Sequence, residues 1–231
     1  MKNSNAFLTR VTSRVSLAAC APALAAAVAV ALPQPAHAGN IKVPPVPSAV
    51  QVKTGNEVFF VGHGVGTQNY VCVPSGSGVA FVLFTPEATL FNDDGKQLTR
   101  NFFSPNPREH NTTPAVFAAG TIRATWQHSN DSSTVWGKVN PGESSSDAHF
   151  VAPNAIAWLL VTVLHAENGP NGGDALSQTS FIQRLNTSGG LAPSQGCTSS
   201  ADLGNSAFVP YTADYFFYRH VRPETDPTTG T

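Results

Sequence analysis

Polar side chains that could bind a ligand occur in segments whose alternating pattern predicts β-strands. In residues 66–73 (GTQNYVCV), the strand period of two places Gln68, Tyr70 and Cys72 on one face. A tyrosine and a disulfide-forming cysteine are expected to face inward, so Gln68 should face inward too. An inward amide needs hydrogen-bond partners, which are either backbone groups or polar atoms of a ligand.

Three further segments carry side chains that could join Gln68. They are residues 121–128 (TIRATWQH) with Trp126 and His128, 179–185 (TSFIQRL) with Gln183 between two apolar residues, and the aromatic segment 209–218 (VPYTADYFFY) with Tyr215. We predict that these groups converge on one pocket, and in particular that Gln68 and Gln183 share a hydrogen-bonded cluster or a cavity. Such a cluster is typical of a small-ligand site, and also of a satisfied core network.

Motifs for metal binding or nucleophilic catalysis are missing from the sequence. None of the seven histidines has HExxH or HxH spacing. His165-Ala166-Glu167 matches the HxE of zinc deaminases, but the partnering PCxxC is absent. No GxSxG nucleophile elbow occurs. We predict no metal site, although a site assembled from distant histidines stays open.

Residues 58–66 (VFFVGHGVG) place three glycines, Gly62, Gly64 and Gly66, after an apolar strand, as in a dinucleotide-binding fingerprint. That fingerprint requires a helix to start at the glycines, so that its N-terminus faces the pyrophosphate. Here residues 67–73 alternate as a strand. We therefore predict that the glycines form a loop or bulge between strands, and that the chain binds neither NAD nor another cofactor.

The N-terminus has the three parts of an export signal. Lys2, Arg10 and Arg14 precede an apolar run, residues 15–32, that ends near the small residues of Ala36-His37-Ala38. We predict cleavage after Ala38 and a secreted or periplasmic protein with no stable membrane insertion. The alternative is a lipoprotein anchored through Cys20, which follows Leu17-Ala18-Ala19.

Cleavage would leave two cysteines, Cys72 and Cys197, in an oxidising compartment, so we expect them to form a disulfide. It would also remove three of the 13 Lys/Arg, leaving ten against 14 Asp/Glu and a formal net charge of −4. No basic patch is evident. This charge balance argues against nucleic acid or an anionic membrane as a partner.

Short strands separated by turn residues predict one all-β domain. The expected strands are residues 57–62, 66–73, 79–85, 121–128, 134–139, 155–165, 179–185 and 209–218, with hairpin turns at 92–95 (NDDG) and 130–133 (NDSS) and a loop over 104–114. The total of about eight to ten short strands indicates a single-domain sandwich or barrel. The expected organisation is a signal peptide over 1–38, a Pro-rich lead-in over 39–56, the β domain over 57–221 and a disordered tail over 222–231.

Several segments resemble the domain of unknown function 3455 family of secreted proteins. They are GTQNYVC (66–72), ATWQHSNDSSTVWGKV (124–139), AIAWLL (155–160), FIQRLNTSGGLAP (181–193) with Cys197, and VPYTADYFFY (209–218). The resemblance implies one exported domain in bacteria or fungi and no assigned activity. Some fungal relatives carry the label malate dehydrogenase, which the glycine segment above does not favour.

Two hypotheses of different classes follow. The first, which we favour, is an exported, disulfide-stapled β-domain that binds a small molecule, a glycan or a protein partner and is not an enzyme. The alternative is a secreted hydrolase or metal-dependent enzyme. The candidate ligand-binding residues are Gln68, Trp126, His128, Gln183 and Tyr215.

Overall fold

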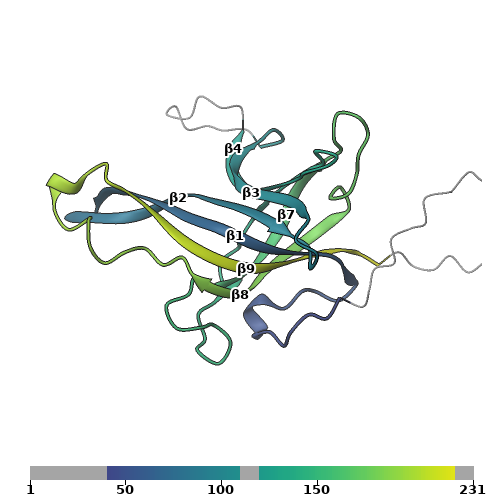
Figure 1. The fold of residues 1–231 in the computed structure, drawn as a ribbon, viewed down its shortest axis with the longest axis horizontal. Helices are drawn as coiled ribbons and strands as arrows, with labels where there is room; N and C mark the ends of the chain where they lie inside the picture. Colours follow the sequence, from purple (N-terminus) through teal and green to yellow (C-terminus); the bar gives the residue numbers. More distant parts are fainter. Residues whose placement is uncertain (1–40, 110–119, 222–231) are drawn as a thin grey trace, which may run out of the picture. The chain divides into compact units, whose positions relative to one another are not determined.

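The structure is a computed structural model that describes residues 41–109 and 120–221 (Figure 1). The predicted signal segment with Cys20, the first residues of the lead-in and the expected disordered tail lie outside the described residues, so these three expectations remain predictions.

Nine antiparallel strands make up nearly all regular structure of the described chain (Figure 1). They are β1 (Asn56–Ser75), β2 (Gly78–Phe91), β3 (Gln97–Asn106), β4 (Thr121–His128), β5 (Thr134–Lys138), β6 (Ser144–Ser145), β7 (Trp158–Glu167), β8 (Thr179–Gly189) and β9 (Ser206–His220). The sheet order is β5-β4-β3-β2-β1-β9-β8-β7-β6, and β5 pairs in addition with β7. That pairing closes eight strands into a barrel, with β6 as an extra strand beside β7. The all-β expectation is confirmed.

Both predicted hairpin turns are present. In the turn between β2 and β3, Gly95 has a φ of 75° and donates its N–H to the carbonyl of Asn92 at 2.9 Å. In the turn between β4 and β5, the N–H of His128 donates to the carbonyl of Ser133 at 2.9 Å. The expected loop after residue 104 begins later than predicted, because residues 104–106 extend β3 and pair with the start of β4.

The three glycines of residues 58–66 lie inside a strand, and the predicted loop or bulge between two strands is wrong. β1 runs without interruption from Asn56 to Ser75. A Cβ on Gly66 would lie 2.0 Å from the carbonyl oxygen of Glu87 in β2, and one on Gly64 would lie 2.8 Å from the ring of Tyr215. The glycines thus allow close approach of neighbouring barrel elements. The expectation that a strand follows Gly66 is confirmed.

Two apolar clusters lie on opposite faces of the sheet. The inner cluster fills the barrel and includes Leu90, Trp126, Ile182, Tyr215 and Phe217. The outer cluster lies on β7, β8 and β9 and is covered by the Pro-rich lead-in; its members include Val50, Trp158, Phe181, Leu185 and Tyr218. Val50, in the 3₁₀ turn η1 (Ser48–Val50), is fully buried. The lead-in therefore stabilises the barrel from outside by burying apolar surface.

The disulfide expected from the sequence is confirmed. Cys72 in β1 is bonded to Cys197, which lies 125 positions later in the chain, and the Cα–Cα distance is 5.5 Å. The bond ties β1 to the loop that leads through the 3₁₀ turn η2 (Ser200–Asp202) into β9. A disulfide is compatible with an extracellular location. Among the described residues, no helix is long and apolar enough to span a membrane.

Candidate functional site

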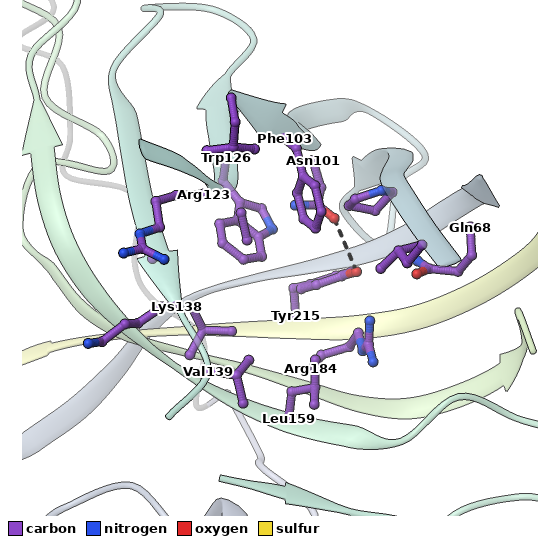
Figure 2. Close-up of a pocket in the computed structure, with 16 residues that line it drawn as sticks. Gln68, Asn101, Phe103, Arg123, Trp126, Lys138, Val139, Leu159, Arg184 and Tyr215 are labelled. Carbon is purple, nitrogen blue, oxygen red and sulfur yellow. Dashed lines mark hydrogen bonds between the residues drawn. The ribbon is translucent and has the colours of Figure 1, made fainter. Parts of the chain in front are cut away.

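A cavity of about 360 Å³ lies inside the barrel (Figure 2). All eight barrel strands contribute to its lining, which comprises Gln68, Leu83, Pro86, Asn101, Phe103, Ile122, Arg123, Ala124, Trp126, Gly137, Lys138, Val139, Leu159, Val161, Arg184 and Tyr215. Alternation along each strand selects most of these side chains, because every second residue of a barrel strand points inward. Arg123 and Lys138 are exceptions, since the residues on both sides of each also line the cavity.

One end of the cavity is closed by aromatic packing and the other is open. Below the cavity, the ring of Phe217 lies 6.4 Å from Trp126 and 5.0 Å from Phe60, both in edge-to-face geometry. At the other end, the lining residues Leu83, Ile122 and Val139 are between 36% and 42% exposed. The cavity therefore has an apolar mouth above a packed floor.

A chain of hydrogen bonds crosses the cavity wall. The hydroxyl of Tyr215 donates to Oδ1 of Asn101 at 3.5 Å, and the amide of Asn101 donates to the carbonyl of Thr125 at 3.1 Å. The hydroxyls of Tyr211 and Tyr215 lie 2.9 Å apart. Burial raises the pKa of both tyrosines, while the positive charge of Arg184 acts in the opposite direction. Both hydroxyls stay protonated at neutral pH and serve as hydrogen-bonding groups.

Besides Nε of Arg184, two buried donors in the lining have no hydrogen-bond partner of standard geometry among the described residues. They are Nε2 of Gln68 and Nε1 of Trp126, and each residue is 2% exposed. Gln68 acts to lower the pKa of the neighbouring Tyr211, but its Nε2 makes no hydrogen bond of standard length and angle. Leaving a buried donor unpaired costs about 1–3 kcal/mol, so such groups call for an explanation. Both donors belong to the cavity wall, where a bound molecule could accept their hydrogen bonds.

The charged groups of the cavity are all cationic. None of its sixteen described lining residues is Asp or Glu, whereas Arg123, Lys138 and Arg184 are included. Arg123 is neutralised by Glu109 through hydrogen bonds of 2.8 and 2.6 Å, which lower the pKa of that carboxyl. Arg184 makes no ion pair within the described part of the chain; its Nη2 donates to the carbonyl of Ala157 at 2.8 Å.

Three of the five candidate residues meet in this cavity. Gln68, Trp126 and Tyr215 all line it, and the rings of Trp126 and Tyr215 are 5.9 Å apart in edge-to-face geometry. The sequence had placed them on inward faces by alternation, and the structure brings them together.

His128 shares the inward face of β4 with Trp126 but lies outside the cavity. Its ring packs against Phe60 at 6.2 Å, and its Nδ1 lies 3.0 Å from Oδ1 of Asp131. Burial opposes ionisation of Asp131, but hydrogen bonds from the backbone of Ala175 and Ser133 outweigh it and lower its pKa to about 2. This carboxylate holds the β4–β5 turn and orients the histidine.

Gln183 lies in the outer cluster, so the predicted pairing with Gln68 is wrong. Its Nε2 donates to the carbonyl of Val50 at 2.6 Å, and its Oε1 accepts from the hydroxyl of Tyr218 at 2.6 Å. The face of β8 that carries Gln183 points away from the barrel interior. The lead-in packs against this outer face, which explains why its neighbours Phe181 and Leu185 are apolar. Gln183 is a structural residue that fastens the lead-in to the barrel.

The sequence reasoning missed Arg184 and Asn101. Arg184 is next to Gln183 and alternates with Ile182, so it lies on the inward face of β8. Alternation would have indicated it once the inward face of β8 was chosen correctly. Asn101 lies in β3, which was not among the expected strands. The described residues contain no group of three or more His, Cys, Asp or Glu side chains that could hold a metal ion.

Comparison with known proteins supports the resemblance seen in the sequence. Residues 53–219 match the family model described as "Protein of unknown function (DUF3455)". This range includes every residue that lines the cavity. No curated protein matches the chain, and no solved structure does.

Proposed function

Given that the chain belongs to the DUF3455 family, whose description assigns no activity, we propose that it is an exported binding protein that holds a small, mainly apolar molecule inside its barrel. The observation that carries the proposal is the pair of buried, unpaired donors in the cavity wall, on Gln68 and Trp126. A ligand with oxygen acceptors would satisfy both.

The remaining lining supports the same function. Apolar and aromatic side chains such as Phe103, Leu159 and Val161 make up most of the wall, and a few polar groups converge between them. That composition and a volume of about 360 Å³ are typical of a site for a small ligand. The sequence left a glycan and a protein partner open as well, but a mainly apolar cavity inside the barrel, open at one end, favours a small molecule.

Export is part of the proposal. It is supported by the signal-like N-terminus over residues 1–38 and by the disulfide between Cys72 and Cys197. Binding rather than catalysis is proposed because the sixteen lining residues supply hydrogen-bond donors and apolar surface, but no histidine, cysteine, serine or carboxylate. No observation on the described residues favours the alternative of a secreted hydrolase.

The proposal is tested with 2-acetylnaphthalene, an uncharged aromatic ketone whose oxygen accepts hydrogen bonds. Calorimetric titration should show saturable binding to one site. Replacement of a donor, in Gln68→Leu or Trp126→Phe, should weaken binding by about threefold to tenfold, since one hydrogen bond contributes about 0.5–1.5 kcal/mol. Arg219→Gln is the control, because Arg219 is exposed and pairs with Glu57 away from the cavity.

Nuclear magnetic resonance provides an internal control. The protein has three tryptophans, so a ¹⁵N spectrum contains three indole N–H signals. Saturation with the ketone should shift the signal of Trp126 and leave that of Trp136, whose Nε1 already donates to Ser104 at 2.9 Å. No shift at Trp126, together with no binding of the ketone or of its carboxylate analogue, would overturn the proposed function.

A further inference from the structure

Among the described residues, the guanidinium of Arg184 has no carboxylate partner, and it lies near the hydrogen-bonding groups of the cavity. Arg184 points inward from β8, and its guanidinium is turned toward the hydroxyl end of Tyr215, on the side where Gln68 lies (Figure 2). Its charge opposes the rise in pKa of three tyrosines, Tyr70, Tyr211 and Tyr215, and a side-chain hydrogen bond from Arg184 also acts to lower the pKa of Tyr215.

The donors of Arg184 are only partly used within the described chain. Its Nη2 donates to the carbonyl of Ala157 at 2.8 Å, whereas its buried Nε has no partner. A partly buried charge without a partner is costly unless another group compensates it. The neighbouring cation Arg123 differs in this respect, because Glu109 binds it through two hydrogen bonds.

Resting on the function proposed above, we infer that the ligand is a carboxylate with an apolar body. Its two oxygens would accept hydrogen bonds from the guanidinium of Arg184, for which a planar carboxylate is the matching partner. The unpaired Nε2 of Gln68 belongs to the same part of the wall and adds a donor. The apolar body would lie against Trp126 and the aliphatic residues that lead to the mouth.

The charge pattern of the lining selects against other ligands of similar shape. Lys138 is a further cationic lining residue, and none of the described lining residues is Asp or Glu. An amine of the same size would place a second positive charge beside Arg184. A neutral ketone would satisfy a donor but leave the guanidinium without a counter-charge.

The test compares three probes that share one ring system: naphthalene-2-carboxylate, the nearly isosteric 2-acetylnaphthalene and 2-naphthylmethylammonium. At pH 7 the carboxylate should bind at least about tenfold more tightly than the ketone, because hydrogen bonds to charged groups contribute about 1.5–3 kcal/mol. The ammonium should bind more weakly than either. Arg184→Gln should reduce carboxylate affinity to that of the ketone and leave ketone affinity within about twofold. Arg184→Lys keeps the positive charge but loses the paired donors of the guanidinium, and it should retain part of the preference for the carboxylate over the ketone.

The outcomes separate this inference from the proposed function. Equal affinity for ketone and carboxylate, or a preference unaffected by Arg184→Gln, overturns the carboxylate inference and leaves the binding function in place. Failure of both probes to bind overturns the function and the inference with it. Arg219→Gln serves as the control for loss of one positive charge at a distance from the cavity.

Discussion

Substitution of the two buried glutamines tests whether Gln68 belongs to a ligand site and Gln183 to a structural contact. Gln68 and Gln183 are 2% and 1% exposed and would be expected to respond alike to substitution if burial alone decided the outcome. Their hydrogen bonding differs, however. Gln183 bonds both Val50 and Tyr218, whereas Nε2 of Gln68 has no partner. Leucine, an apolar residue of similar size, is the matched substitution at both positions.

The magnitudes follow from the groups that each substitution leaves behind. Gln183→Leu leaves two buried groups without a hydrogen-bond partner. They are the carbonyl of the fully buried Val50 and the hydroxyl of Tyr218, whose pKa is raised to about 12 by burial. Each unpaired buried group costs about 1–3 kcal/mol, so the free energy of unfolding should fall by about 2–6 kcal/mol. Gln68→Leu removes an unpaired donor and should change that free energy by less than about 1 kcal/mol, in either direction.

Thermal unfolding measured by circular dichroism reports the difference. At about 2–4 °C per kcal/mol for a chain of this size, Gln183→Leu should lower Tm by roughly 4–24 °C, and Gln68→Leu by no more than about 4 °C. Urea unfolding at constant m-value checks that both variants unfold from the same fold. Equal destabilisation by the two substitutions would refute the assignment of Gln68 to a ligand site and of Gln183 to a structural contact.

Four further predictions follow from the described residues. Reduction of the disulfide, whose cysteines are 125 positions apart, should cost about 4–5 kcal/mol and lower Tm by several degrees or more; two free thiols titrated in the unfolded, unreduced protein would contradict the presence of the bond. His63 has a raised pKa, chiefly through its hydrogen bond to Asp214. Its contribution to stability should be complete below about pH 6.5 and lost as the pH rises through the folded-state pKa. Urea midpoints of wild type and His63→Gln across pH 5–9 would show this, and parallel profiles would argue against it. Gly66→Ala should destabilise by at least about 1–3 kcal/mol, because the new Cβ meets the backbone of β2. Gly78→Ala, whose new Cβ would come no closer than 4.0 Å to another group, should change stability by less than about 1 kcal/mol. Since a strand follows Gly66, calorimetric titration with NADH should show no saturable binding, and micromolar affinity would contradict this.

Local sequence patterns were sufficient for the elements that depend on neighbouring residues. Alternation identified the inward face of β4, with Trp126, and of the part of β1 that carries Gln68. Turn residues located both hairpins, since positive φ at Gly95 and polar side chains at residues 130–133 have local causes. The disulfide followed from having two cysteines in the expected mature chain, and its partners were therefore determined without knowledge of the fold.

Local patterns could not predict that β1 continues through its three glycines. Gly62, Gly64 and Gly66 suggest a loop when only the chain itself is considered. Their role becomes visible when β2 and Tyr215 are present, because those groups occupy the space that side chains would need. The constraint comes from residues at least twenty positions away in the chain.

The choice of face in β8 shows the same limit most clearly. Both faces of β8 are largely apolar. Phe181, Gln183 and Leu185 lie on one face, and Ile182 and Arg184 lie on the other. Alternation cannot tell which face is inside when both are covered. The lead-in covers the first face and closure of β5 on β7 encloses the second, so only the tertiary structure places Arg184 in the cavity and Gln183 outside it. Residue type and spacing determined the strands and the disulfide, whereas contacts between distant segments decided which side chains meet, because a strand's pattern records that a face is buried but not what buries it.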